Sequence, residues 1–165
     1  MATKKKSKKT AAKSSPKKAK AAKKAPAKRR APAAKPGWKL DSVAPSITAN
    51  DLAKSLGWYR DVVGFVVDET WMHDGKVAGA QLSAGNVVFM LGQDDWKKGR
   101  DRKKGEGFRL YCMVTGDIDA MAKGMQARGG TLDQPPTDQP WGMRDFALTD
   151  PDGFKITVAK VTKKR

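Results

Sequence analysis

The first 37 residues of this chain cannot form a hydrophobic core, because they contain no Phe, Trp, Tyr, Leu, Ile or Val. Lysine-rich runs in this segment are interrupted by Pro16, Pro26, Pro32 and Pro36. Charge repulsion, the lack of apolar side chains and recurrent proline all oppose a packed structure. We therefore expect residues 1–37 to be a disordered basic tail and residues 38–165 to fold as one domain.

Most of the net charge lies in this basic tail. The chain has a formal net charge of +17, and residues 1–37 supply +15 of it, from 13 Lys and 2 Arg with no acidic residue. Such a segment is expected to bind nucleic acid without reading its sequence, because it neutralises phosphates and has no folded surface for base contacts. The tail residues expected to contact phosphates are Lys4, Lys5, Lys6, Lys17, Lys18, Lys23, Lys24, Lys28, Arg29 and Arg30.

Other interpretations of the tail remain open. Its Lys-Ala-Pro composition resembles the tails of linker histones and their bacterial counterparts, which implies a nucleoid-associated protein. A solubility tail or a localisation signal would have a similar composition, whereas an organelle transit peptide would favour Arg and an amphipathic helix. The chain has no apolar run long enough to cross a membrane and one cysteine, Cys112. We therefore expect a soluble cytoplasmic protein from a reducing compartment.

The folding part of the chain shows the same order of elements twice. In the first unit, about residues 42–92, Asn50 is expected to cap a helix that ends at Gly64. In the second unit, about residues 108–160, Asp117 is expected to cap a helix that ends at Gly129. Strands are expected at residues 42–48, 65–71, 77–83, 86–91, 108–114, 131–132, 143–149 and 154–158. The fold class is therefore α+β, with two βαβββ units joined by a basic loop at residues 93–107.

Two motifs in these units indicate a family. Residues 51–65, DLAKSLGWYRDVVGF, resemble the first helix of vicinal oxygen chelate proteins, the glyoxalase, bleomycin-resistance and dioxygenase superfamily. Residues 141–154, WGMRDFALTDPDGF, are similar to the terminal hairpin of that family, with Asp-Pro-Asp-Gly as its turn. Proline, aspartate and glycine each favour such a turn. The resemblance implies a strongly curved mixed sheet whose concave side holds the ligand.

The metal ligands that this resemblance implies are missing. Metal-dependent members carry His, Gln or Glu at one inward position on each of the first, fourth, fifth and eighth strands. The matching positions here are Ala44, Met90, Arg109 and Thr157, which do not form a metal-binding set. We therefore expect no metal, no cofactor and no catalytic residues. The single histidine, His73, lies in a turn signature and is expected to be a solvent-exposed turn residue.

A ligand pocket without catalytic groups is the remaining prediction for the concave side. Strand alternation from Arg109 places Tyr111 and Met113 on one face and Cys112 on the other. The expected ligand-binding residues are Ser46, Met90, Arg109, Tyr111, Met113, Trp141 and Thr157, with Val88 and Trp71 as further candidates. The ligand would be a small aromatic or amphipathic molecule with a negative or acceptor group. The alternative is that these side chains simply fill the core.

Three functions are compatible with the sequence. The first is a non-catalytic small-molecule-binding protein, with drug sequestration of the bleomycin-resistance type as one form. The second is a glyoxalase-like, lyase-like or dioxygenase-like enzyme with an atypical site. The third is a nucleoid-associated protein that uses the domain as a dimeric scaffold. A homodimer is expected from the resemblance, and the six basic residues of the loop at 93–107 provide either a second nucleic-acid contact or only a solvated surface.

Overall fold

The computed structural model describes residues 41–162. The basic tail, with its expected phosphate contacts, lies outside the described residues, as do residues 38–40 and 163–165. Within residues 41–162 no helix is long and apolar enough to cross a membrane. The elements are β1(Ser46–Ala49), α1(Leu52–Gly57), the π-helix η1(Trp58–Val63), β2(Val66–His73), β3(Lys76–Ala84), β4(Val87–Gln93), β5(Arg109–Met113), α2(Ile118–Ala127), β6(Leu132–Gln139), β7(Met143–Thr149) and β8(Lys155–Val161).

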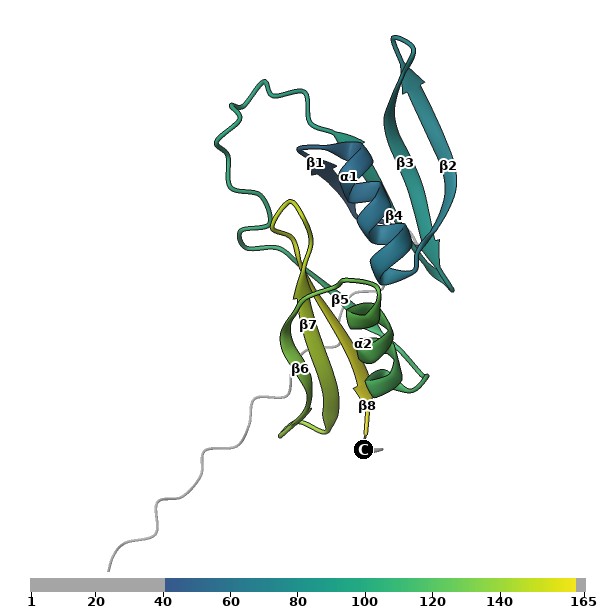
Figure 1. Cartoon of the computed structure of the whole chain (residues 1–165), viewed down its shortest axis with the longest axis vertical. Coiled ribbons are helices and arrows are strands. Elements are labelled where there is room, and N and C mark those ends of the chain that lie inside the picture. The colour runs from purple at the N-terminus through teal and green to yellow at the C-terminus, as the bar shows by residue number, and fades with distance from the viewer. Residues whose placement is uncertain (1–40, 163–165) are drawn as a thin grey trace, which may run out of the picture. The chain divides into compact units, whose positions relative to one another are not determined.

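These elements form two βαβββ modules, which confirms the predicted fold class (Figure 1). The N-terminal sheet has the strand order β1-β4-β3-β2, and the C-terminal sheet has the order β5-β8-β7-β6. In each sheet the first and last strands of the module pair in parallel and the other pairs are antiparallel. The Asp-Pro-Asp-Gly motif is the turn between β7 and β8, as the sequence predicts.

Several element boundaries differ from the sequence-based expectation. The N-cap of α1 is Asp51, whose carboxylate accepts from the Lys54 backbone N–H at 3.0 Å, and not Asn50. Strand β1 begins only after Pro45, because proline has no N–H to donate to a ladder. Strand β6 continues through Pro135 and Pro136, which is tolerated because β6 is an edge strand with shifts in register.

One hydrophobic core runs through both modules. Helix α1 contributes Leu52 and η1 contributes Tyr59, while α2 contributes Ile118, Ala122 and Met125. Figure 1 shows α1 and α2 each lying along the sheet of its own module. The other core residues come from the helix-facing sides of the two sheets and include Leu82, Phe89, Leu91, Phe146, Leu148, Ile156 and Val158.

A buried hydrogen bond joins the first module to the β7–β8 turn of the second. The hydroxyl of Tyr59, on η1, donates to Oδ2 of Asp150 at 2.9 Å. The other carboxylate oxygen of Asp150 accepts from the backbone N–H groups of Asp152 and Phe154, at 2.9 and 2.7 Å. Burial raises the pKa of Asp150 even though these donors favour its charged form. Asp150 therefore fixes the turn and also holds it against the first module.

Asp152 makes a second connection of the same kind. Its two carboxylate oxygens accept from the Asn50 backbone N–H and from the Ser55 hydroxyl, each at 2.6 Å. Ser55 is fully buried on α1. The two aspartates of the motif thus bind two different parts of the first helical segment, a role that the turn chemistry alone does not reveal. We call the contacts of Tyr59, Asp150, Asp152 and Ser55 the module clamp.

The loop between the modules is held by its own ion pairs. Lys104 and Asp94 have side chains only 2% and 5% exposed, and their charged groups lie 2.7 Å apart. Arg102 also pairs with Asp94. The Lys104 ammonium, the Trp96 backbone N–H and Arg102 hold the pKa of Asp94 well below its usual range. This anchored loop lies beside β1, because the Lys104 ammonium also donates to the Thr48 carbonyl at 3.1 Å.

The loop cations are therefore mostly committed within the domain. In addition to Lys104 and Arg102, Lys97 pairs with Asp95 and Lys103 with Glu106. Arg100 lies over the ring of Trp96, 4.5 Å from its centroid. Arg102 and Lys104 thus anchor the loop, whereas Lys97 and Lys103 remain highly exposed.

The module clamp predicts a specific order of stabilities. Asp150→Ala removes the acceptor for two backbone N–H groups and for Tyr59, so we expect a loss of about 3 kcal/mol in the free energy of unfolding. Asp150→Asn keeps one acceptor oxygen for both N–H groups and can donate to the tyrosine oxygen, so about 1 kcal/mol is expected. Urea denaturation of the two variants measures these losses. Asp61→Asn, at an exposed aspartate that pairs with Arg60, is the control and should leave stability essentially unchanged.

The same clamp has a pH signature. Burial and the carboxyl groups of Asp150 and Asp152 hold the pKa of Tyr59 far above its usual value. Above about pH 10 the unfolded chain ionises this tyrosine while the folded chain keeps the proton, so its contribution to stability falls as pH rises. The stability difference between the natural chain and Tyr59→Phe should therefore narrow above about pH 10. A difference that is independent of pH would contradict a buried, hydrogen-bonded Tyr59 hydroxyl.

Candidate functional site

The candidate site lies on the side of the C-terminal sheet that faces away from α2. On β5, Arg109, Tyr111 and Met113 are exposed, whereas Leu110 and Cys112 pack against the core. This alternation, which the sequence predicts, follows from the two-residue period of a strand. We call the solvent-facing side, with Arg109, Tyr111 and Met113 of β5 and their neighbours on the adjacent strands, the open face.

Arg109 is the central charged group of the open face. Its Nη1 donates to the hydroxyl of Thr157 at 2.7 Å. Thr157 is 4% exposed, so it serves to position the guanidinium and offers little surface to a ligand. Among residues 41–162, no carboxylate lies within ion-pair distance of Arg109. The guanidinium therefore keeps donors available for a molecule on this face.

A second cation, Lys155 on β8, stands beside Arg109 in the parallel register. Two clefts of the open face include both residues. One, of about 350 Å³, crosses to Asp133 and Thr149, and the other, of about 590 Å³, extends to the loop around Lys104. The sequence-based set omitted Lys155. Strand alternation from Thr157 would have identified it, because Lys155 precedes Thr157 by two residues.

Apolar groups lie along β5 beyond Arg109. Tyr111 and Met113 are 50% and 52% exposed. The Tyr111 hydroxyl donates to the sulfur of Met143, on β7, at 3.5 Å. The open face thus has a cationic end at Arg109 and an aromatic and thioether end at Tyr111, although the clefts around Arg109 include neither Tyr111 nor Met113.

The other expected ligand-binding residues lie elsewhere. Ser46 and Met90 are register partners on the N-terminal sheet, and neither lines the clefts around Arg109. Trp141 is 56% exposed in the turn between β6 and β7. The structure therefore brings Arg109, Tyr111, Met113 and Thr157 to one face of the C-terminal sheet and places Ser46 and Met90 on the other sheet.

Trp71 and its partner glycine are part of the N-terminal sheet. The expectation that Trp71 ends a strand is wrong, because β2 continues to His73. The indole ring lies against Gly79 on β3, where an added Cβ would come within 2.4 Å of the ring. The position next to this ring therefore requires a glycine, and the Trp71 ring lies against β3.

The positions that match the family's metal ligands do not form a donor set. Ala44 precedes β1, while Met90, Arg109 and Thr157 lie on β4, β5 and β8. Within the part of the chain that the structure describes, no group of three or more His, Cys, Asp or Glu side chains is arranged to hold a metal ion.

The two remaining reactive side chains lie where the sequence predicts. His73 ends β2 at the hairpin turn, with a side chain 80% exposed and 3.4 Å from the Asp74 carboxylate. Cys112 faces the core side of β5, and burial raises the pKa of its thiol. A raised pKa lowers the thiolate fraction and therefore the nucleophilicity of this cysteine.

The fold and the site can now be compared with known proteins. Residues 39–158 match the model of the Glyoxalase/Bleomycin resistance protein/Dioxygenase superfamily. The chain belongs to this superfamily. A search of curated proteins finds no match to the chain.

Similar solved structures support the same fold. The glyoxylase/bleomycin resistance protein/dioxygenase domain from Frankia sp. is 20% identical, with a TM-score of 0.63, and the match covers 77% of this chain and 96% of that one. TioX from Micromonospora sp. is also 20% identical, with a TM-score of 0.59 and coverage of 73% and 99%. A glyoxalase-related enzyme from Clostridium phytofermentans is 19% identical, with a TM-score of 0.59 and coverage of 76% and 98%. At these identities the likeness shows the fold and leaves the activity of this superfamily member open.

Proposed function

We propose that this protein binds a small amphipathic anion on the open face without transforming it. The proposal rests on the contacts of the Arg109 guanidinium. Its guanidinium is fixed by the Thr157 hydroxyl, has no carboxylate partner among residues 41–162, and stands beside Lys155. A guanidinium with free, oriented donors matches a carboxylate, sulfonate or other planar acceptor group.

The apolar part of the ligand would lie along β5. Tyr111 and Met113 are half exposed and follow Arg109 at two-residue intervals. Aromatic and thioether side chains bind flat rings well, because both are polarizable and make favourable ring contacts. Shape and charge of this kind are sufficient for sequestration, which needs no chemistry. Drug sequestration of the bleomycin-resistance type is one form of such a function.

The Arg109 assignment can be tested with an aromatic anion. We expect Arg109→Met to weaken the binding of 1-anilinonaphthalene-8-sulfonate by about tenfold or more, because a charge-assisted hydrogen bond is lost. Fluorescence titration of the full chain measures the affinity, and thermal unfolding should show an intact fold.

The control for this variant is Arg60→Met, which removes the same charge from an exposed residue already paired with Asp61. Equal affinity of the Arg109 and Arg60 variants would exclude Arg109 as the anchor. Unfolding of the Arg109 variant would instead assign this residue to the scaffold.

We further propose that a second copy of the chain covers part of the exposed sheet surface. Five large apolar side chains are at least half exposed on strands of the two sheets, namely Val66, Met72, Tyr111, Met113 and Val161. Apolar groups of this size on sheet surfaces favour association. A two-fold dimer would bury them and complete the ligand site.

Sedimentation equilibrium of the full chain in high salt tests the dimer. We expect a mass of twice 17.9 kDa at micromolar concentration. Tyr111→Ser should shift the equilibrium toward the single chain, because it removes an exposed ring from the interface. A monomer at high micromolar concentration would refute the dimer and leave the Arg109 site to be completed within one chain.

A second function, nucleic-acid binding and with it association with the nucleoid, is favoured by the charge of the tail. Residues 1–37 carry +15. We propose that the tail follows the phosphate backbone by releasing counterions and places the domain, with its ligand, close to nucleic acid. Two loop cations of the domain, Arg102 and Lys104, are already held by Asp94, which leaves them less available to phosphates.

A comparison of the full chain with a chain that begins at Trp38 tests the tail. We expect the full chain to bind duplex DNA of any sequence, with log affinity falling by about 0.9 per log salt for each phosphate neutralised. The shortened chain should bind weakly at every salt concentration. Equal affinity of the two chains, or an affinity that does not change with salt, would remove nucleic acid from the proposed function.

A further inference from the structure

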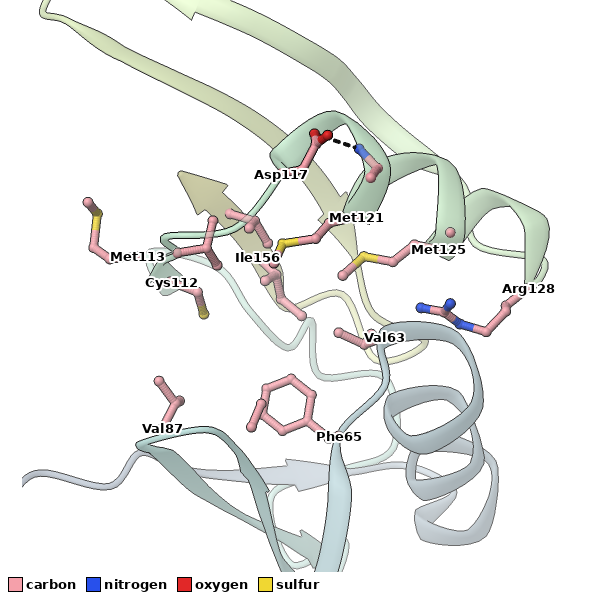
Figure 2. Close-up of a pocket in the computed structure, with 15 residues that line it drawn as sticks. Val63, Phe65, Val87, Cys112, Met113, Asp117, Met121, Met125, Arg128 and Ile156 are labelled. Atoms are coloured by element: carbon pink, nitrogen blue, oxygen red, sulfur yellow. Dashed lines mark hydrogen bonds between the residues drawn. The ribbon is translucent and has the colours of Figure 1, made fainter. Parts of the chain in front are cut away.

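A second concave site lies on the opposite side of the C-terminal sheet from the open face. It is a groove of about 540 Å³, bounded by α2, by the end of η1 with the start of β2, and by the turn between β3 and β4. Its floor includes Cys112, Ile156 and Val158, which alternate along β5 and β8 with the residues of the open face. Figure 2 shows Cys112 and Ile156 at the groove. Met113 lines the mouth, with a side chain that points away from Met121.

The middle of the groove is apolar and adaptable. Met121 and Met125 stand one helical turn apart on α2, and Phe65 and Val87 face them from the first module (Figure 2). Unbranched thioether side chains adjust to irregular ligands and make favourable contacts with rings and methylene groups. A volume of about 540 Å³ falls in the range of small-molecule sites.

One end of the groove has a cation with free donors. The Nε of Arg128 donates to the Val62 carbonyl at 3.0 Å, and in Figure 2 the guanidinium is directed toward Val63 and Met125. No carboxylate of residues 41–162 lies within ion-pair distance of Arg128. Its terminal nitrogens are thus available to an anion that enters the groove.

Gly124 makes room for this guanidinium on the surface of α2. A Cβ at Gly124 would lie 3.2 Å from Nη1 of Arg128, one turn further along the helix. A glycine inside a helix costs about 1 kcal/mol relative to alanine. The position of the Arg128 guanidinium at the groove explains why a glycine, which destabilises a helix, occurs at position 124.

The other end of the groove has the opposite charge. Asp117 caps α2, and its carboxylate accepts from the backbone N–H groups of Asp119 and Ala120. Asp117 and Arg128 are separated by eleven residues, or about 16 Å of helix rise. A molecule with one acidic group would place it at Arg128, and a second acidic group toward Asp117 would be repelled.

We propose that this groove is a binding site for a monocarboxylate with an apolar chain, with the carboxylate on Arg128 and the chain along Met125, Met121 and Phe65. This site goes beyond the open-face function, because the two lie on opposite sides of the same sheet and use different cations. Each can bind without the other.

Decanoate is a suitable probe, with decanol as its uncharged counterpart. Binding to the full chain is followed at physiological salt by calorimetry and by NMR of methionine methyl groups, which report position. We expect decanoate to shift the Met121 and Met125 methyl signals. Arg128→Gln should weaken decanoate about tenfold and leave decanol unchanged.

Lys123→Gln is the matched control, because Lys123 is an exposed cation on the same helix and lies outside the groove. It should change the decanoate affinity less than about twofold. If Arg128→Gln is unstable through loss of the Val62 contact, Ala120→Leu provides a second test. Leucine is a good helix former and would narrow the groove, so it should weaken decanoate and decanol alike.

Three results would overturn the proposal. The first is a decanoate-induced shift at Met143, which contacts Tyr111, instead of at Met121 and Met125; this would place the molecule on the open face. The second is an equal loss of decanoate affinity in the Arg128 and Lys123 variants. Such a result would show that decanoate responds to the net charge of the protein and not to a contact with Arg128. The third is the absence of decanoate binding, which would leave the open-face proposal untouched, because that proposal is tested at Arg109 with a different probe.

Discussion

The hydrogen bond between the Tyr59 hydroxyl and the Asp150 carboxylate fixes the position of the β7–β8 turn against the first module. The strand ladders stay within each module, so the relation between the modules depends on the shared core and on the contacts across it. The clamp is directional where the apolar core is not, because a hydrogen bond requires a defined distance and angle. Both proposed sites depend on this, since the groove has walls from both modules and the open face ends near the loop that joins them.

Strand alternation places different side chains on the two sides of the C-terminal sheet. Arg109 and Tyr111 face one side of β5, and Cys112, between Tyr111 and Met113, faces the other. A guanidinium with free donors stands at each side, Arg109 on the open face and Arg128 in the groove. Each is fixed by one oxygen of the chain, the Thr157 hydroxyl or the Val62 carbonyl. Such fixed cations lower the entropic cost of binding an acidic group, because the side chain is already ordered.

Much of the fold could be predicted from local sequence. The repeated order of strand, helix and three strands follows from periodicity and from caps such as Asp117, and the Asp-Pro-Asp-Gly turn follows from the chemistry of its residues. The helix and strand boundaries predicted from the sequence were less accurate than the order of the elements. Asn50 and Asp51 are equivalent cap residues by type, and the choice of Asp51 reflects the long-range bond from the Asn50 backbone N–H to Asp152.

The sequence by itself determined the fold class and the face of β5 on which Arg109, Tyr111 and Met113 lie, because each depends on composition or on neighbours a few residues apart. The tertiary structure decided which side chains meet. Ser46 and Met90 share a sheet that does not contain Arg109, whereas Arg128 meets Val62 across 66 residues of chain. Pairing between distant segments is set by how the modules pack, and no local pattern of residues encodes that geometry.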